Sequence, residues 1–375
     1  MQKKITTFIR ALAVELGTII GAGVLGLPYV AAHAGWGIGM LYLICLSVLV
    51  TGLHLMIGEV AVRTREPLQL VGLAGKYMGR VGKIIMGVSL FLGSFGVLLV
   101  YIIGEGAVLK ALFGGTEMMW SIIFWFFCSV ILFFGLKLVS HIDVFLSMGV
   151  VLVIVCIAVL GARFVHVENL RSMNVAYLFL PYGSFLFALM GASAIPQVEE
   201  IVASRQVAFK RVIMTAGIIV AIVYALFVTV TVGVTGIGTT EVATVGLGNA
   251  LGGTVVVLGN VFALCAMLGG FLNIGIATKR VFTRDYRMGR TSAWAITCVT
   301  PLVLFIFAAR DFIKTLSMVG AVFGTINTIL FIIMYWRARE KGDMPARSFQ
   351  LHHALLLSTA VLAAFLAGTF LTFFR

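Results

Sequence analysis

Charged residues are scarce in this chain. Only 11% of its 375 residues are Asp, Glu, Lys or Arg, whereas 61% are hydrophobic. About a quarter of the residues in a soluble globular domain are charged, so this composition excludes a water-soluble globule. The sequence also lacks low-complexity tracts and long polar segments, which leaves no room for a soluble domain. We therefore expect a single transmembrane domain that covers residues 1–375 and lies in a lipid bilayer.

The sequence also lacks the motifs of metal sites and enzymes. Its five cysteines lie one apiece in five apolar segments, without the Cys-x-x-Cys or Cys/His spacing of a metal site. We find no His-Glu-x-x-His motif, no phosphate loop and no Ser/His or paired-Asp arrangement at one depth. We therefore expect no metal, no cofactor and no enzymatic activity.

Long apolar runs are abundant instead. Segments of about 20 apolar residues, the length that crosses a bilayer, occur eleven times. The sequence thus predicts an all-α membrane protein with about eleven transmembrane helices. The runs cover residues 9–32, 37–62, 83–109, 118–137, 144–164, 175–198, 211–236, 247–278, 291–309, 314–336 and 351–374.

The positive charges are unevenly distributed. A net charge of +13 could indicate nucleic-acid binding, but an excess of Lys and Arg in cytoplasmic loops is the usual signal of membrane orientation. With the N-terminus in the cytoplasm, 21 of the 27 basic residues fall on that side. We expect this orientation, in the inner membrane of a prokaryote, and no nucleic-acid partner. The six remaining residues are Lys110, Arg163, Arg171, Arg310, Lys314 and Arg375.

The first apolar run contains residues that break helices. Residues 17–29 read GTIIGAGVLGLPY, with four glycines and Pro28. Non-helical backbone at membrane depth persists only where it is buried in protein or lines a cavity, and the N-terminus of the following half-helix attracts anions. The run therefore predicts a broken helix that binds a carboxylate. The alternative is that its small residues only let two helices pack closely.

A second break is predicted in the sixth run. Residues 190–196 read MGASAIP, and Pro196 lacks an amide donor and clashes with the preceding turn. Discontinuous helices at corresponding positions of two halves indicate an inverted repeat with a transport site at the midplane. We expect five helices in each repeat, the first over about 9–164 and the second over about 175–336. An extra C-terminal helix would cover about 351–374.

These motifs resemble those of the amino acid-polyamine-organocation superfamily, and within it the aromatic amino acid permeases and the amino acid/auxin permeases. The first match begins with residues 17–23 and continues to residues 27–29. The others are Ala34-Gly35-Trp36 and Ser193-Ala194-Ile195-Pro196. The resemblance implies the fold of the sodium-coupled leucine transporters, with an amino acid bound between spans one, three, six and eight.

The resemblance also implies which groups hold the substrate. The backbone amides of Ala22 and Gly23 would bind its carboxylate. Carbonyls near Ile19 and Ile20, and those of residues 190–193, would bind its ammonium group. Tyr101 in span three lies near the level at which a tyrosine in relatives reaches the carboxylate, and the alternative is a packing or lipid-facing tyrosine. The full set of expected substrate-binding residues is Thr18, Ile19, Ile20, Gly21, Ala22, Gly23, Tyr101, Met190, Gly191, Ala192, Ser193, Gly269 and Asn273.

The sequence departs from the sodium-coupled relatives at their ion sites. A hydroxyl pair of span eight is replaced by Gly269-Gly270, and Val24 stands where a side-chain oxygen would follow the first break. A proton is therefore the expected coupling ion, which requires an intramembrane carboxyl group. Glu15 is the main candidate, because six residues of helix place it about 9 Å from the break. Glu59 and Glu105 are further candidates, and an ion-paired or interfacial carboxylate is the alternative for all three.

The sequence as a whole predicts secondary active transport of a hydrophobic or aromatic amino acid, driven by protons through alternating access. An amino-acid-sensing receptor on the same fold is an open alternative. A major-facilitator carrier is another, because residues 285–290, DYRMGR, faintly resemble that family's loop motif. The odd number of spans and the two broken helices argue against the second alternative. The sequence does not predict an oligomeric state.

Overall fold

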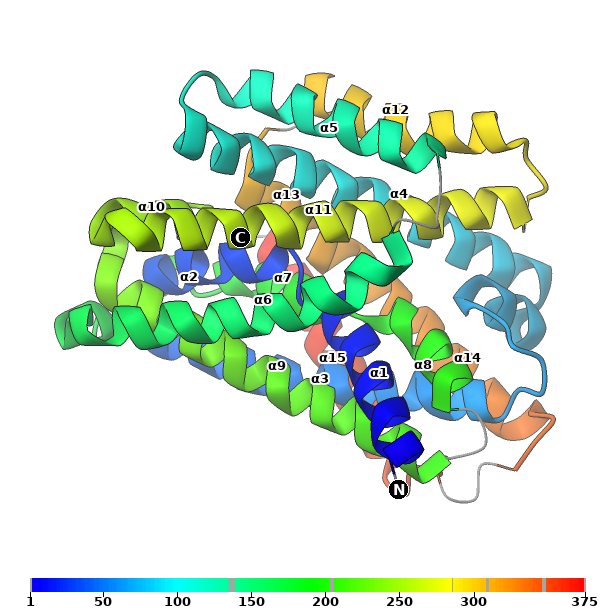
Figure 1. The fold of residues 1–375 in the computed structure, drawn as a ribbon. Helices are drawn as coiled ribbons and strands as arrows, with labels where there is room; N and C mark the ends of the chain where they lie inside the picture. Colours follow the sequence, from blue (N-terminus) through cyan, green and yellow to red (C-terminus); the bar gives the residue numbers. More distant parts are fainter. Residues whose placement is uncertain are drawn as a thin grey trace.

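The computed structural model describes residues 2–134, 139–202, 206–284, 286–307, 310–345 and 349–373. Within these ranges every regular element is a helix. The helices form one bundle, in which the two halves of the chain are interleaved (Figure 1). An all-helical bundle follows from the composition, because a helix satisfies its own backbone amides and carbonyls in an apolar surrounding.

The first half of the chain contains six helices, and the first two form one bent pair. The angle between the two members of that pair is 53°. The helices are α1 (Gln2–Ile19), α2 (Gly23–Ala34), α3 (Trp36–Val62), α4 (Leu70–Phe113), α5 (Glu117–Phe134) and α6 (Val139–Gly161).

The second half also begins with an interrupted helix. A 3₁₀ turn (Ala192–Ala194) lies in the interruption, and a π turn (Val319–Phe323) joins two later helices. The helices are α7 (Leu180–Leu189), α8 (Ile195–Val202), α9 (Gln206–Thr235), α10 (Ala243–Leu251), α11 (Gly253–Arg284), α12 (Arg290–Phe307), α13 (Phe312–Met318), α14 (Gly324–Lys341) and α15 (Ala354–Phe373).

The predicted spans coincide with these helices in order along the chain. Over the described residues, nine helical segments are long and apolar enough to cross a membrane, and the α1/α2 pair makes a further crossing. The predicted fifth run, 144–164, corresponds to α6. Both predicted breaks are present, so the expected fold class is confirmed. The proposed limits of the two repeats stay a prediction.

Two glycines make the helices differ from the predicted runs. The third run, 83–109, lies inside the longer α4, which begins at Leu70 and kinks at Gly79 with φ of 72°. The eighth run, 247–278, is divided between α10 and α11 at Gly252, whose φ is 65°. Positive φ is accessible to glycine without steric cost, so each glycine sets a bend that hydropathy alone does not reveal.

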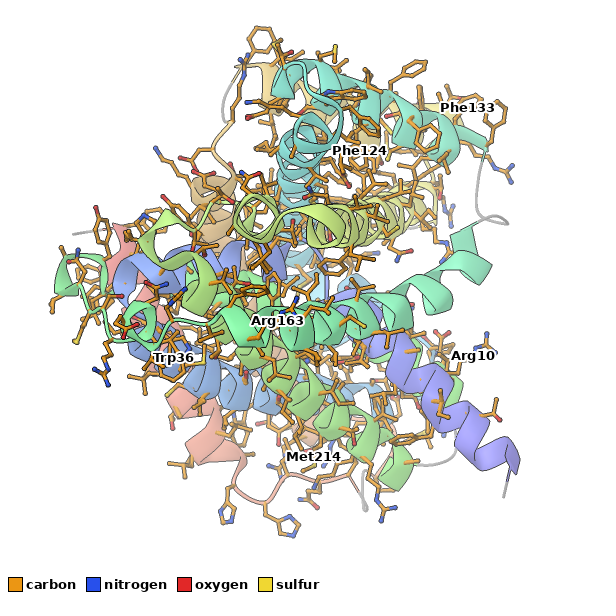
Figure 2. The ribbon with its side chains drawn as sticks, turned by 60° about the vertical axis from the view of Figure 1, so that its left-hand side comes forward. Arg10, Trp36, Phe124, Phe133, Arg163 and Met214 are labelled. Carbon is orange, nitrogen blue, oxygen red and sulfur yellow. The ribbon has the colours of Figure 1, made fainter. Side chains whose placement is uncertain are left out.

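The helices pack as two groups. The helices α4, α5, α11 and α12 lie together on one side of the bundle, and α1, α3, α8 and α9 lie on the other (Figure 1). Figure 2 shows Phe124 and Phe133 in the first group and Arg10 and Met214 in the second. The C-terminal α15 packs against α3, α7 and α14. The half-helices α1 and α8 thus belong to the second group, and Tyr101 of α4 in the first group reaches Gly21, between α1 and α2.

The bundle has two ends, which we call the N-terminal face and the opposite face. The N-terminal face holds the start of α1 and the end of α3, and the opposite face holds the end of α2 and the start of α3. On the opposite face, the backbone amides of Phe312 and Ile313 donate to Glu241, which ties the segment before α10 to the start of α13. Burial raises the pKa of the Glu241 carboxyl, and the nearby Asp311 raises it further.

Candidate functional site

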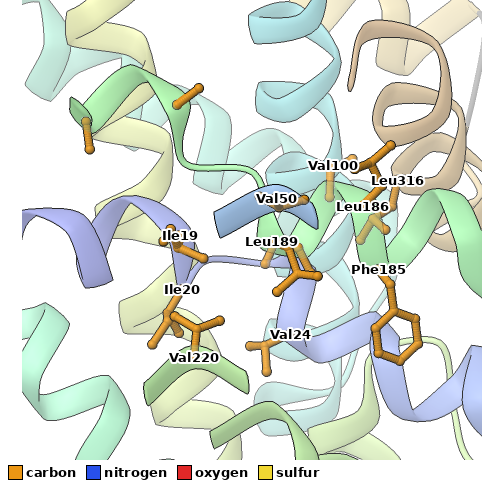
Figure 3. Packing of buried hydrophobic residues seen from close by; sticks show 14 of the residues in the cluster. Ile19, Ile20, Val24, Val50, Val100, Phe185, Leu186, Leu189, Val220 and Leu316 are labelled. Carbon is orange, nitrogen blue, oxygen red and sulfur yellow. The ribbon is translucent and has the colours of Figure 1, made fainter. Parts of the chain in front are cut away.

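The two interruptions lie next to each other in the middle of the bundle. Between α1 and α2 the helix stops at Ile19 and resumes at Gly23, and between α7 and α8 it stops at Leu189 and resumes at Ile195. Figure 3 shows Ile19, Ile20 and Leu189 around this junction. The half-helices α1 and α8 pack against each other, as do α2 and α7. Four helix ends therefore meet at one place.

Tyr224 on α9 bonds to both interruptions. Its hydroxyl lies 3.2 Å from the Ile19 carbonyl oxygen and 2.9 Å from the Ala188 carbonyl oxygen, so its one hydrogen is shared between two acceptors. The side chain is completely buried. Sequence reasoning missed this residue, because a tyrosine in a long apolar helix carries no signal of what it contacts. The Ile19 carbonyl, expected to face a substrate ammonium group, already has this partner.

Tyr101 on α4 occupies the space beside the first interruption. A Cβ atom on Gly21 would lie 2.8 Å from its hydroxyl oxygen, and one on Gly270 would lie 2.3 Å from it. The backbone amide of Ala22 donates toward the same hydroxyl. Three sequence-predicted residues, Tyr101, Gly21 and Ala22, thus lie together. The glycines leave room for a phenol ring that is 6% exposed.

Two other glycines of the junction serve close packing. A Cβ atom on Gly23 would lie 2.6 Å from Ala188 Cα, and one on Gly191 would lie 2.3 Å from Ile19 Cγ1. Gly23 therefore lets α2 and α7 pack closely, which was the alternative interpretation of the glycine-rich run. The same run provides both close helix contacts and access to backbone amides.

Glu15 on α1 lies against a histidine that sequence reasoning overlooked. The carboxyl oxygen Oε1 is 3.4 Å from Nδ1 of His54 on α3, and both residues are buried. Neither Glu15 oxygen has a hydrogen-bond partner. The Gly191 amide donates to His54 Nε2 at 3.3 Å. His54 therefore connects the predicted proton-coupling residue to the interruption between α7 and α8.

The other two carboxyl candidates have different surroundings. Glu59 on α3 accepts hydrogen bonds from Arg63, the Tyr335 hydroxyl and the Leu351 amide, and lies 3.7 Å from Arg339. These contacts agree with the ion-paired interpretation of Glu59.

Glu105 on α4 is fully buried, and neither of its oxygens has a hydrogen-bond partner. It lies close enough to the thiols of Cys128 and Cys265 to affect them electrostatically. These two cysteines belong to α5 and α11 and not to the interrupted helices.

The remaining predicted residues differ in exposure. Ala192 and Gly269 are buried, Thr18, Met190 and Asn273 are half-buried, and Ser193 is exposed. Gln197, one turn beyond Ser193 on α8, is also exposed. By contrast, residues 21–28 are all buried. The α8 side of the junction is thus less closely packed than the α2 side.

A hollow opens on the N-terminal face below this exposed side. It encloses about 360 Å³ and is lined by Thr6, Thr7 and Arg10 of α1 and Glu200 and Ile201 of α8. The same two half-helices thus border the hollow and lead to the junction. Among the described residues, no group of three or more His, Cys, Asp or Glu side chains could hold a metal ion.

Comparisons of sequence give one family and several relatives. The model of the tryptophan/tyrosine permease family matches residues 4–372. The chain is 25% identical to tyrosine-specific transport system 1 of Haemophilus influenzae over 86% of both chains. It is 28% identical to tyrosine-specific transport system 2 of that species over 95% of both. Glutamine transporter 2 of Aliivibrio fischeri is 21% identical over 87% of both.

Two solved structures share the fold. MhsT, in a crystal structure with L-phenylalanine, superposes with a TM-score of 0.65 over 98% of this chain and 97% of its own. Mhp1, a nucleobase-cation-symport-1 transporter in a closed conformation, superposes with a TM-score of 0.60 over 98% and 93%. Each is 15% identical in sequence, so these likenesses establish the architecture alone.

Proposed function

We propose, because the chain belongs to the tryptophan/tyrosine permease family, that it carries an aromatic amino acid across the cytoplasmic membrane together with a proton. Family membership makes the chain a multi-pass amino acid transporter and not an enzyme. The choice of an aromatic substrate is supported by the two tyrosine-specific relatives. The glutamine transporter among the relatives gives a second candidate substrate.

The observation that carries the proposal is the pairing of the Ala22 amide with the Tyr101 hydroxyl beside the first interruption. An amide at the N-terminus of a half-helix is a ready donor to a carboxylate, and a phenol hydroxyl can donate to the same anion. A substrate carboxylate would take the Ala22 amide from Tyr101. The aromatic side chain would then lie toward Gly191 and Ser193, on the less closely packed side of the junction.

Alternating access follows from how the half-helices are packed. The halves α2 and α7 pack against α13, and the halves α1 and α8 pack against each other and against α9 and border the hollow on the N-terminal face. We place the N-terminal face in the cytoplasm, because 21 of the 27 basic residues then fall on the cytoplasmic side. The structure then corresponds to a state open to the cytoplasm, and tilting of α1 and α8 would close it.

Substrate binding can be tested on the purified protein. We expect tyrosine, tryptophan or phenylalanine to raise its unfolding temperature most in a screen of the twenty amino acids. A ligand that binds only the folded state stabilises it by about 2.7 kcal/mol at one hundred times its Kd. Uptake of the best ligand into proteoliposomes then separates a carrier from a sensor. A larger shift with glutamine than with any aromatic amino acid would overturn the proposed substrate.

The coupling ion can be tested in the same vesicles. We expect an imposed pH gradient, acidic outside, to drive accumulation without sodium, and a protonophore to abolish it. The reason is that Gly269, Gly270 and Val24 offer no side-chain oxygen where the sodium-coupled relatives bind the ion. Vesicles without protein provide the control. Uptake that depends steeply on sodium and ignores the pH gradient would show that the coupling was assigned wrongly.

A further inference from the structure

We propose that Glu15 and His54 form a single protonation site, and that His54 transmits its state to the interruption between α7 and α8. This inference rests on the proposed proton coupling and names the groups that carry it out. Its basis is the continuous contact from Glu15 Oε1 to His54 Nδ1, and from His54 Nε2 to the Gly191 amide. Ionisable residues inside a membrane domain face partners of this kind when they take part in ion transport.

The hydrogen bond from Gly191 fixes which nitrogen of His54 carries a proton. A backbone amide can only donate, so Nε2 must accept and carries no hydrogen. The hydrogen of a neutral imidazole is therefore on Nδ1, which faces Glu15 at 3.4 Å. The ring is thus hydrogen-bonded at Nε2 and faces the Glu15 carboxyl group with Nδ1. In a doubly protonated ring, the N–H group at Nε2 would face the N–H group of Gly191, and the hydrogen bond between them would be lost.

Glu15 is the group that can accept the transported proton. It is fully buried, and its oxygens have no hydrogen-bond partner. Tyr101 of α4 and Tyr224 of α9 are titratable side chains at the junction, and the Tyr224 hydroxyl is held by the Ile19 and Ala188 carbonyls. Glu199 and Glu200 lie farther along α8, toward the N-terminal face. Among the described side chains, His54 is the basic residue that pairs with Glu15.

A small cavity beside His54 gives room for the proton donor. It measures about 10 Å³ and is lined by His54, Ser47, Thr51 and Gly217, among others. This is the space that one water molecule needs. The Ser47 hydroxyl has no hydrogen-bond partner in the described structure, and a water in the cavity would supply one. The cavity thus adjoins His54 where α3 meets α9 and the ends of α1 and α7.

The proposed cycle moves one proton and forms no other bond. A proton carried by water binds a Glu15 carboxylate oxygen, an O–H bond forms, and the negative charge that holds Nδ1–H is lost. His54 is then free to turn and release the Gly191 amide, which lies where α7 unwinds. Because Gly191 packs directly against Ile19, the end of α1 responds as well. On the other side of the membrane, water removes the proton and the ring returns.

Three variants test the proposal in proteoliposomes. Glu15→Gln cannot take up a proton, and His54→Gln keeps an acceptor for Gly191 without a titratable ring. We expect both to lose accumulation driven by a pH gradient while they retain exchange of labelled for unlabelled substrate. Glu105→Gln is the matched control, because Glu105 is equally buried and without hydrogen bonds, while the cysteines near it belong to α5 and α11. It should accumulate substrate as the unmodified protein does.

A measurement without substrate separates this proposal from the proposed function. Infrared difference spectra between acidic and alkaline buffer should show a carboxylic acid band that Glu15→Gln removes, that His54→Gln shifts and that Glu105→Gln leaves in place. Thermal unfolding of each variant checks folding. If the unmodified protein carries no aromatic amino acid but these bands behave as stated, the proposed function fails and the protonation site stands.

Two results would overturn the inference itself. One is gradient-driven accumulation by His54→Gln with the pH profile of the unmodified protein. The other is loss of accumulation in Glu105→Gln together with its retention in Glu15→Gln, which would assign the proton to α4 instead.

Discussion

Gly23→Ala is expected to abolish uptake although the chain still inserts into the membrane. The added Cβ would lie 2.6 Å from Ala188 Cα and 2.8 Å from Ala188 Cβ, closer than the 3.0 Å that real Cβ atoms keep. Both contacts are with atoms that cannot turn away, so α2 must move off α7. Uptake of labelled substrate and the amount of protein in the membrane are the two measurements.

Two further substitutions make this result specific. Gly37→Ala on α3 is the control, because a Cβ there meets nothing within 4 Å, and it should transport normally. Uptake by Gly21→Ala should lie between that of the other two variants. Its Cβ would meet the hydroxyl end of Tyr101 at 2.8 Å, and that side chain can shift. Normal uptake by Gly23→Ala would show that the contact between α2 and α7 is dispensable.

Glu59→Gln is expected to cause the largest loss of stability. The carboxylate is fully buried and is contacted by Arg63, Arg339, Tyr335 and the Leu351 amide. Removing one partner of a buried ion pair costs about 3–5 kcal/mol, because the remaining charges are left without compensation. Thermal or denaturant unfolding of the purified protein measures the change.

The matched control is Glu117→Gln. Glu117 also pairs with a basic residue, Lys110, at 2.9 Å, but its side chain is 57% exposed. An exposed pair contributes between about 0 and 1 kcal/mol, so this variant should unfold close to the unmodified protein. Equal unfolding temperatures for the two variants would mean that the contacts of Glu59 do not stabilise the fold.

Much of the fold could be predicted from the sequence, because it depends on local properties. Apolar length fixes where the helices are, and glycine and proline mark where α1/α2 and α7/α8 are interrupted. The kink at Gly79 and the division at Gly252 were not predicted. Glycine occurs 42 times in the chain, and its sequence context does not show which copies adopt positive φ.

The candidate site was predictable only in part. Residues 18–23 and 190–193 were identified because glycine and proline mark the two interruptions in the sequence. Tyr101 was identified because of the resemblance to a family. His54 and Tyr224 were not, since their partners are 137 and 205 positions away along the chain. A single polar side chain in an apolar helix gives no indication of the element it will contact. Only the packing of α3 and α9 against the interrupted helices reveals both roles.

Tyr224 has a mechanical consequence for transport. One hydroxyl group bonds to the last residue of α1 and to Ala188 near the end of α7, so it ties the two interruptions to α9 and to each other. A displacement of one interruption relative to the other must therefore break one of these hydrogen bonds or carry the phenol ring with it.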